Sequence, residues 1–278
     1  MNSINIGNKI TALRKQAGYT QDELAELLGI TAQAISRWEN GHSLPETSLL
    51  PLLSKMLNSS IDSILMPIGI SIGEQIEFGK YKWQVLDVDG NNAFIISETT
   101  VGKAPYQDFG DTTWEHCGLR KYLNREFYET FSNNEKSKII KTKVSDRDNP
   151  WQGTKCGNPT FDNLFLLSYD EVVKYFGDSG DLENKRGKYC THEGKFVETS
   201  ENSMYTKHPH GDAIYDEYNE NRRVKNANGE DAWWWLRSPG GQGIHTTGSV
   251  GYLGEIWLCG DDAHRVDGGI RPALWLKL

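Results

Sequence analysis

Histidine and cysteine side chains that could ligate a metal ion occur in three short groups along this 278-residue sequence. The groups are His116-Cys117, Cys190-x-His192 and His208-Pro209-His210. A structural zinc site needs four ligands, usually as two spaced pairs such as C-x-x-C, and none of the groups has that spacing. We therefore predict no metal site and interpret these histidines as surface or core residues.

Motifs of common enzyme classes are also missing. The sequence has no G-x-S-x-G nucleophile elbow, no G-x-x-x-x-G-K-[ST] phosphate loop and no H-E-x-x-H zinc helix. The run Gly240-Gly241-Gln242-Gly243 is rich in glycine, but it follows a proline and precedes no helical pattern, so it does not indicate a phosphate cradle. We predict a protein that is not an enzyme, with no catalytic residue and no cofactor.

Aromatic residues and cysteines divide the sequence into two parts. Only Tyr19 and Trp38 precede residue 67, whereas every other Trp, Tyr and Phe and all four cysteines follow it. The change falls at Met66-Pro67-Ile68-Gly69, because proline cannot continue a helix and glycine favours a turn. We expect two domains and a linker, over residues 1–66, 74–278 and 67–73 respectively.

Charge and hydropathy restrict the partners and the compartment. The formal net charge of −8 disfavours wholesale coating by nucleic acid, although a local DNA-reading surface remains compatible with it. No apolar run approaches the roughly 20 residues that cross a bilayer, and the N-terminus lacks the layout of a signal peptide. The four cysteines are widely spaced, which is typical of reduced thiols. We expect a cytoplasmic protein with no membrane partner.

The first domain has the pattern of short helices. Thr20-Gln21-Asp22-Glu23 forms a capping box that starts one helix, and Gly29 ends that helix just before Thr31 caps the next. The two helices, residues 21–29 and 32–40, have the lengths of a helix-turn-helix, whose second helix can lie in the major groove. With a helix before them, one at 49–57 and a short one at 61–65, we expect an all-α domain of five helices.

Specific residues within this domain carry a family resemblance. They are Leu13-Arg14, Gly18, Thr20-Gln21, Glu23-Leu24-Ala25, Gly29-Ile30, Ile35 and Trp38-Glu39-Asn40-Gly41. In this order and spacing they resemble the phage-repressor-like (XRE/Cro) helix-turn-helix family, over nearly the whole of residues 4–66.

The resemblance implies a double-stranded DNA operator as partner. It places Gln21 against a phosphate at the start of the first motif helix, and it places base-edge contacts on the second, at Ala32, Gln33, Ser36 and Arg37. It also pairs Arg14 with Glu39 as a scaffold ion pair. Acidic residues outnumber basic ones in residues 1–66, so non-specific affinity is weak, and useful binding needs two copies on a two-fold operator. We therefore expect a homodimer.

The second domain alternates strand and helix patterns. Residues 76–96 predict an antiparallel meander, residues 119–127 and 134–140 predict helices, and Ser168-Tyr169-Asp170-Glu171 is a second capping box. Trp234-Trp235-Leu236-Arg237-Ser238-Pro239-Gly240 and Gly269-Ile270-Arg271-Pro272-Ala273-Leu274 are similar to an uncharacterised bacterial domain family. That family in turn resembles the C-type-lectin-like fold of formylglycine-generating enzymes and retroelement-diversified receptors. The resemblance implies an α+β, lectin-like domain.

A lectin-like fold implies a ligand face on the loops between Leu236 and Ile270. The side chains expected there are Gln242, His245, Thr246, Tyr252, Glu255, Trp257, Asp261, Asp262 and His264. Formylglycine-type oxidation needs paired cysteines, and Cys259 has no nearby companion. The leading hypothesis is a transcriptional regulator whose second domain binds a ligand or a protein partner. The alternatives are a diversified lectin-like receptor tethered by the small domain, and an enzyme on that scaffold.

Overall fold

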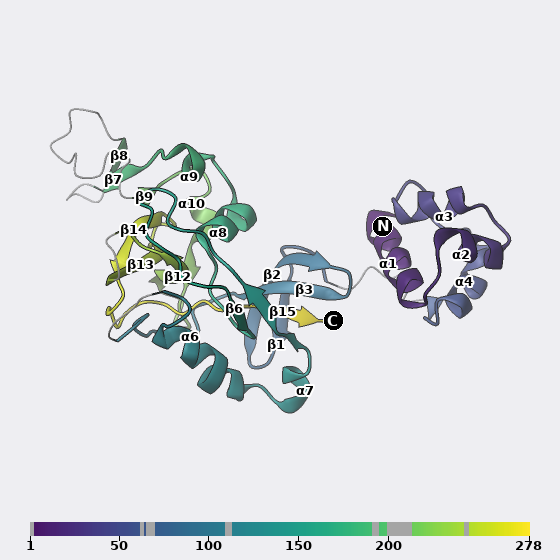
Figure 1. Ribbon diagram of the computed structural model, residues 1–278, viewed down its shortest axis with the longest axis horizontal. Coiled ribbons are helices and arrows are strands. Elements are labelled where there is room, and N and C mark those ends of the chain that lie inside the picture. The colour runs from purple at the N-terminus through teal and green to yellow at the C-terminus, as the bar shows by residue number, and fades with distance from the viewer. Residues whose placement is uncertain are drawn as a thin grey trace. The chain divides into compact units, whose positions relative to one another are not determined.

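The computed structural model describes residues 3–61, 64, 70–108, 113–190, 195–198, 213–241 and 245–278 (Figure 1). The chain divides into two compact units, Met1–Glu74 with Asp87–Ala93, and Gln75–Leu86 with Phe94–Leu278. The described part of the chain contains no helix with the length and apolar character needed to span a membrane.

The described part of residues 3–64 is all-helical. Its elements are α1 (Ser3–Gln16), α2 (Gln21–Leu28), α3 (Ala32–Glu39), η1 (Thr47–Leu49) and α4 (Leu50–Met56). Their buried residues form one cluster: Ile6, Ile10, Leu24, Ala25, Leu28, Ile35, Trp38, Leu53, Leu57 and Ile64. At the predicted fifth helix, Ile61 and Ile64 are helical, and Asp62, Ser63 and Leu65 lie outside the described residues. The Met66–Gly69 motif lies outside them as well.

Close packing of α1 against α3 depends on a glycine. A Cβ atom at Gly7 would lie 2.3 Å from the carbonyl oxygen of Trp38, so only glycine allows the two backbones to approach this closely. Trp38 itself is 5% exposed and belongs to the core cluster.

A five-stranded sheet in the second part of the chain has the strand order β1-β2-β3-β15-β4. Its strands are β1 (Gln75–Phe78), β2 (Tyr81–Asp89), β3 (Asn92–Ser97), β15 (Ala273–Lys277) and β4 (Ile139–Ile140). The predicted meander is confirmed, with Ile76 opposite Trp83. The predicted helix over 134–140 is wrong at its end, because α7 covers only Asn133–Lys136 and Ile139–Ile140 pairs with β15. That partner is distant in sequence, so local periodicity could not reveal it.

A six-stranded sheet has the order β12-β13-β14-β9-β7-β8. Its strands are β12 (Trp234–Pro239), β13 (Thr246–Val250), β14 (Ile256–Asp262), β9 (Ala213–Ile214), β7 (Lys188–Cys190) and β8 (Phe196–Glu198). Figure 1 shows these strands gathered around the label β14. The alternating side chains Ile256 and Leu258 are fully buried, whereas Trp257 between them is half-buried. On β14, one face therefore packs on the core, and the other is partly open.

Short helices and two small ribbons complete this part of the chain. The helices are α6 (Gly118–Tyr122), η2 (Leu123–Phe127), η3 (Tyr128–Thr130), α8 (Tyr169–Phe176), α9 (Asp181–Asn184) and α10 (Asn219–Arg222). The ribbons pair β5 (Thr142–Val144) with β6 (Thr160–Asp162), and β10 (Val224–Lys225) with β11 (Asp231–Ala232). The predicted capping box at Ser168 and Glu171 is present and starts α8.

Arg237, from the tryptophan-rich sequence motif, has a structural role. Its guanidinium is 4% exposed, and it donates to Glu171 Oε1 at 3.0 Å, to the Leu166 carbonyl at 2.6 Å and to the Ser145 carbonyl at 2.9 Å. Because Glu171 also caps α8, Arg237 connects that helix to β12. The C-terminal part is therefore rich in β-sheet, and the buried Arg237–Glu171 contact holds α8 against it.

Candidate nucleic-acid interface and ligand face

Local sequence signals set the positions of the two motif helices. The Thr20 hydroxyl accepts from the Glu23 backbone N–H at 3.2 Å, and the Glu23 carboxylate accepts from the Thr20 backbone N–H at 2.7 Å. Gly29 then ends α2 with a φ of 67°, in the left-handed region that glycine tolerates. The Thr31 hydroxyl caps α3 by accepting from Ala34 N–H at 3.2 Å. The turn between the helices is therefore defined at both ends.

The outward side of α3 carries the four predicted base-edge residues. Gln33 and Arg37 are exposed, and Ala32 and Ser36 are half-buried. The opposite side, with Ile35 and Trp38, lies in the core. Asn40 donates to the Ser36 carbonyl at 2.8 Å and to the Ser36 hydroxyl at 3.3 Å. The Asn40 side-chain amide therefore lies next to Ser36 at the C-terminal end of this surface. The structure thus brings the four residues together on one solvent-facing side of the helix.

A buried ion pair holds α3 against α1. Arg14 Nε donates to Glu39 Oε1 at 2.6 Å, Arg14 Nη2 donates to Glu39 Oε2 at 3.0 Å, and Arg14 Nη1 donates to the Tyr19 carbonyl at 2.7 Å. Burial alone would raise the pKa of Glu39, but the hydrogen bonds from Arg14 and Gln21 outweigh it and lower that pKa below its usual range. The expected Arg14–Glu39 pair is confirmed.

Gln21 belongs to the same network, a link that sequence reasoning missed. Its Nε2 donates to Glu39 Oε2 at 2.7 Å, and the side chain is half-buried. A primary amide has two N–H bonds, so one remains for another acceptor. The sequence did contain a signal for this bond, namely Glu39, which is part of the family pattern. A carboxylate that accepts two hydrogen bonds from an arginine still has lone pairs for a further donor.

The nine residues predicted for the ligand face differ in exposure. His245, Tyr252, Asp262 and His264 are exposed, Thr246, Trp257 and Asp261 are half-buried, Glu255 is buried, and Gln242 lies outside the described residues. Glu255 is 6% exposed, because the tight turn between β13 and β14 encloses its carboxylate. The predicted set is thus only partly a displayed surface.

The β13–β14 hairpin separates these residues into two groups. At its open end, Thr246 lies opposite Asp262, and His264 Nδ1 lies 2.8 Å from Asp262 Oδ1. At its turn end, Trp257 Nε1 donates to Glu255 Oε1 at 3.0 Å. Trp257 and Asp262 are five residues apart on β14, which at about 3.3 Å per residue corresponds to roughly 16 Å along the strand. The structure therefore presents two small patches rather than one.

Two aromatic residues beside Trp257 were not predicted. The Phe196 ring lies 6.1 Å from the Trp257 ring, centroid to centroid, and stacks on the Tyr215 ring at 4.3 Å. Both lie outside the stretch between Leu236 and Ile270 from which the ligand face was predicted: Phe196 is in β8, and Tyr215 directly follows β9. Their place beside β14 depends on the strand order of the sheet, which the sequence pattern does not contain.

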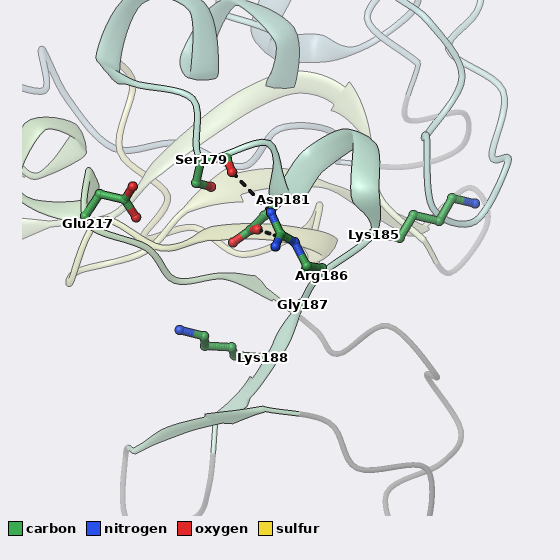
Figure 2. Close-up of a pocket in the computed structure, with 7 residues that line it drawn as sticks. All are labelled: Ser179, Asp181, Lys185, Arg186, Gly187, Lys188 and Glu217. Atoms are coloured by element: carbon green, nitrogen blue, oxygen red, sulfur yellow. Dashed lines mark hydrogen bonds and ion pairs between the residues drawn. The ribbon is translucent and has the colours of Figure 1, made fainter.

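A polar cavity of about 510 Å³ is lined by Ser179, Asp181, Lys185, Arg186, Gly187, Lys188 and Glu217. Figure 2 shows these residues. Arg186 Nε lies 2.9 Å from Asp181 Oδ1, and Lys185 points away from the other side chains. Charges of both signs line this cavity, so it selects neither anions nor cations. The described residues contain no cluster of three or more His, Cys, Asp or Glu that could hold a metal ion.

Comparison with known families finds a different match for each of the two parts of the chain. Residues 90–278 match the family described as "Domain of unknown function (DUF6273)". This chain belongs to the DUF6273 family. Ahead of the DUF6273 region, residues 10–64 match the family described as "Helix-turn-helix". The N-terminal prediction of a helix-turn-helix domain is therefore confirmed.

Curated relatives match the helix-turn-helix part alone. The "Uncharacterized HTH-type transcriptional regulator YazB" of Bacillus subtilis is 36% identical over 61 residues, which are 22% of this chain and 88% of YazB. The "HTH-type transcriptional activator BcrR" of Enterococcus faecalis is 36% identical over 62 residues, 22% of this chain and 30% of BcrR. ImmR of Bacillus subtilis is 37% identical, with 49% of its length covered. The chain thus spans less than half of BcrR and of ImmR.

Among solved structures, the P22 c2 repressor in complex with a synthetic operator is 35% identical to this chain. The match covers 22% of this chain and 94% of the repressor chain, with a TM-score of 0.22. A solution structure of the DNA-binding domain of the same repressor is 37% identical, covers 23% of this chain and 86% of that one, and has a TM-score of 0.22.

Proposed function

We propose that the protein is a sequence-specific DNA-binding transcriptional regulator. Its partner is a double-stranded DNA operator, read by α3. The observation that carries the proposal is the exposed side of α3, where Gln33 and Arg37 project into solvent from a helix held by the buried Arg14–Glu39 pair. Rigid support matters, because base readout needs side chains held in one register over the groove. Relatives of the helix-turn-helix part are named as transcriptional regulators.

Each predicted contact has a definite chemistry. Gln33 can bond the N6 and N7 atoms of adenine, Arg37 can reach guanine or a phosphate, and the Ala32 methyl group can touch a thymine methyl. Ser36 has a hydroxyl donor for a base or a phosphate. Gln21 keeps one amide N–H beyond its bond to Glu39, and a phosphate oxygen is the acceptor we assign to it.

We further propose that the regulator acts as a homodimer. Acidic residues outnumber basic ones in residues 1–66, so one copy releases few counterions on binding and has weak electrostatic affinity. Two copies on a two-fold operator, with half-sites about one helical turn apart, add their contacts. The titration of a palindromic site should therefore be cooperative, with a stoichiometry of two chains per site.

For the second part of the chain we propose a C-type-lectin-like fold with a binding role rather than catalysis. An antiparallel sheet with one partly open face, and exposed polar loops at the end of the β13–β14 hairpin, support this reading. A bound ligand or protein partner changes operator affinity only where it distinguishes two states of the whole chain, typically by about 1–3 kcal/mol.

Selection from random DNA followed by binding titrations tests the DNA contacts. Gln33→Ala and Arg37→Ala should each weaken binding to the preferred site by about 1–3 kcal/mol and broaden the sequence preference, because both face the bases. Gln16→Ala, an exposed glutamine at the end of α1, and Arg125→Ala, an exposed arginine in η2, are the matched controls. Equal affinity in all four variants, with folding intact, would refute the assigned contacts.

A further inference from the structure

Three aromatic rings meet on the partly open face of the six-stranded sheet. We call Phe196, Tyr215 and Trp257 the aromatic corner. Phe196 stacks on Tyr215 with ring centroids 4.3 Å apart and planes 12° apart, and it meets Trp257 at 6.1 Å with planes 54° apart. All three residues are half-buried. Phe196 lies in β8, Tyr215 follows β9 and Trp257 lies in β14. In the sheet, β14 is next to β9, and β7 lies between β9 and β8 (Figure 1).

A buried carboxylate lies at the edge of the aromatic corner. Glu255 Oε1 accepts from Trp257 Nε1 at 3.0 Å, and Glu255 Oε2 accepts from the Leu253 backbone N–H at 2.9 Å. These two bonds fix both the carboxylate and the plane of the indole ring. No Lys, Arg or His in the described part of the chain forms an ion pair with Glu255, which is 6% exposed.

One further carboxylate, Asp261, adds negative charge near Glu255. Burial raises the pKa of Glu255, and the charge of Asp261, farther along β14, raises it further. Asp261 has its own partners, since Arg265 Nη1 donates to its Oδ1 at 2.8 Å and the Ser249 hydroxyl also donates to it. Among the described residues, no cation is paired with an ionised Glu255, and a positive charge over the neighbouring rings would supply one.

We propose that the aromatic corner, with Glu255 behind it, binds a quaternary ammonium group. Ring faces attract cations through their quadrupoles, most strongly Trp, and this attraction increases where water is excluded. The burial of Glu255 favours a quaternary over a primary ammonium group. Ring faces offer no lone pair of hydrogen-bonding strength, and Glu255 is too enclosed to accept from a ligand, so a primary ammonium would find no protein acceptor for its N–H groups there. A fully methylated nitrogen has no N–H to satisfy.

This inference deepens the proposed ligand-binding role of the second domain and rests on it. It names a class of ligand for the turn-end patch, and it adds Phe196 and Tyr215 to the residues involved. The open-end patch, with Asp262 and His264, takes no part in it. DNA binding by α3 is a separate property, so the two can fail separately.

Calorimetric titration of the full chain with three small probes tests the proposal directly. Choline should bind, while 3,3-dimethylbutan-1-ol, its uncharged carbon isostere, should bind at least about tenfold more weakly, because it has the same shape without the charge. Ethanolamine, the primary ammonium, should also bind more weakly than choline. Equal affinity for choline and its isostere, or no binding of choline at millimolar concentration, would overturn the proposal.

Variants of the chain locate the site. Trp257→Leu and Tyr215→Leu should each weaken choline binding about tenfold, and Glu255→Gln should weaken it through loss of the charge. Phe161→Leu is the matched control, since Phe161 is 61% exposed on β6, in another sheet. Circular dichroism checks folding, and where Trp257→Leu unfolds the chain, Tyr215→Leu and the isostere comparison decide.

Titration of operator DNA with the same samples separates this inference from the proposed regulator. Specific DNA binding without choline binding refutes the quaternary ammonium site and leaves the regulator standing. Choline binding that Phe161→Leu weakens as much as Tyr215→Leu places the ligand elsewhere and overturns the assignment to the aromatic corner.

Discussion

Removal of the Glu39 carboxylate should destabilise the helix-turn-helix domain by an amount that the structure lets us estimate. The Arg14 and Glu39 side chains are 9% and 5% exposed, so water cannot replace a lost partner. Glu39→Ala leaves the Arg14 guanidinium buried without its two carboxylate bonds, and breaking a buried pair in this way costs about 3–5 kcal/mol. A loss of about 3 kcal/mol corresponds to a roughly hundredfold change in an opening equilibrium.

Hydrogen-exchange mass spectrometry of the full chain measures the change in this opening equilibrium within the helix-turn-helix domain. Backbone amides of α1 and α3 should exchange roughly a hundredfold faster in Glu39→Ala, in line with that estimate. Glu46→Ala is the control, because Glu46 is an exposed carboxylate of the same domain whose side chain caps no helix. The double variant Arg14→Met with Glu39→Leu should restore most of the protection, since neither charge is then buried. Acceleration below about threefold in Glu39→Ala, or no recovery in the double variant, would refute the reasoning.

Three further predictions concern pH, domain independence and packing. Because the bonds from Arg14 hold the pKa of Glu39 below its usual range, the stability from this carboxylate is present above the pKa of an unfolded-chain Glu and is lost as the pH falls through the lower folded value. Urea titrations should show this loss, and Glu39→Gln should remove it. The fragments 1–66 and 74–278 should each give a cooperative thermal transition by circular dichroism, and a fragment that is unfolded alone would contradict the two-domain division. Leu236→Ala should cost about 2–5 kcal/mol in chemical denaturation, whereas exposed His245→Ala should change stability by less than about 0.5 kcal/mol; equal losses would contradict the burial pattern.

The helix-turn-helix could be predicted closely because its signals are local. The capping box at Thr20, the left-handed Gly29 and the cap at Thr31 lie within a dozen residues, and the physical chemistry of each needs no distant partner. The Gln21–Glu39 bond could not be derived in the same way, because it joins the start of α2 to the end of α3 across the packed interface.

The second domain shows the opposite case. Ile139–Ile140 has an apolar pattern that suits a helix end or a strand, and only its pairing with β15 decides between them. The ligand face was predicted from one stretch of sequence, yet Phe196 and Tyr215 reach Trp257 from other strands. Burial of Glu255 likewise follows from the turn that encloses it rather than from its residue type. Residues that meet through strand order are invisible to periodicity.

The position of β15 has a consequence for how the chain folds during synthesis. β15 lies between β3 and β4 in the five-stranded sheet, so this sheet closes only when residues 273–277 reach strands that left the ribosome much earlier. Pairing of such distant segments carries a large loop-closure cost and is slow. The helices of residues 3–61 need no such partner, and they can form their core while the ribosome is still translating the rest. For a nascent chain, the helix-turn-helix domain can therefore fold before the five-stranded sheet closes, and until then one edge of β3 has no paired strand.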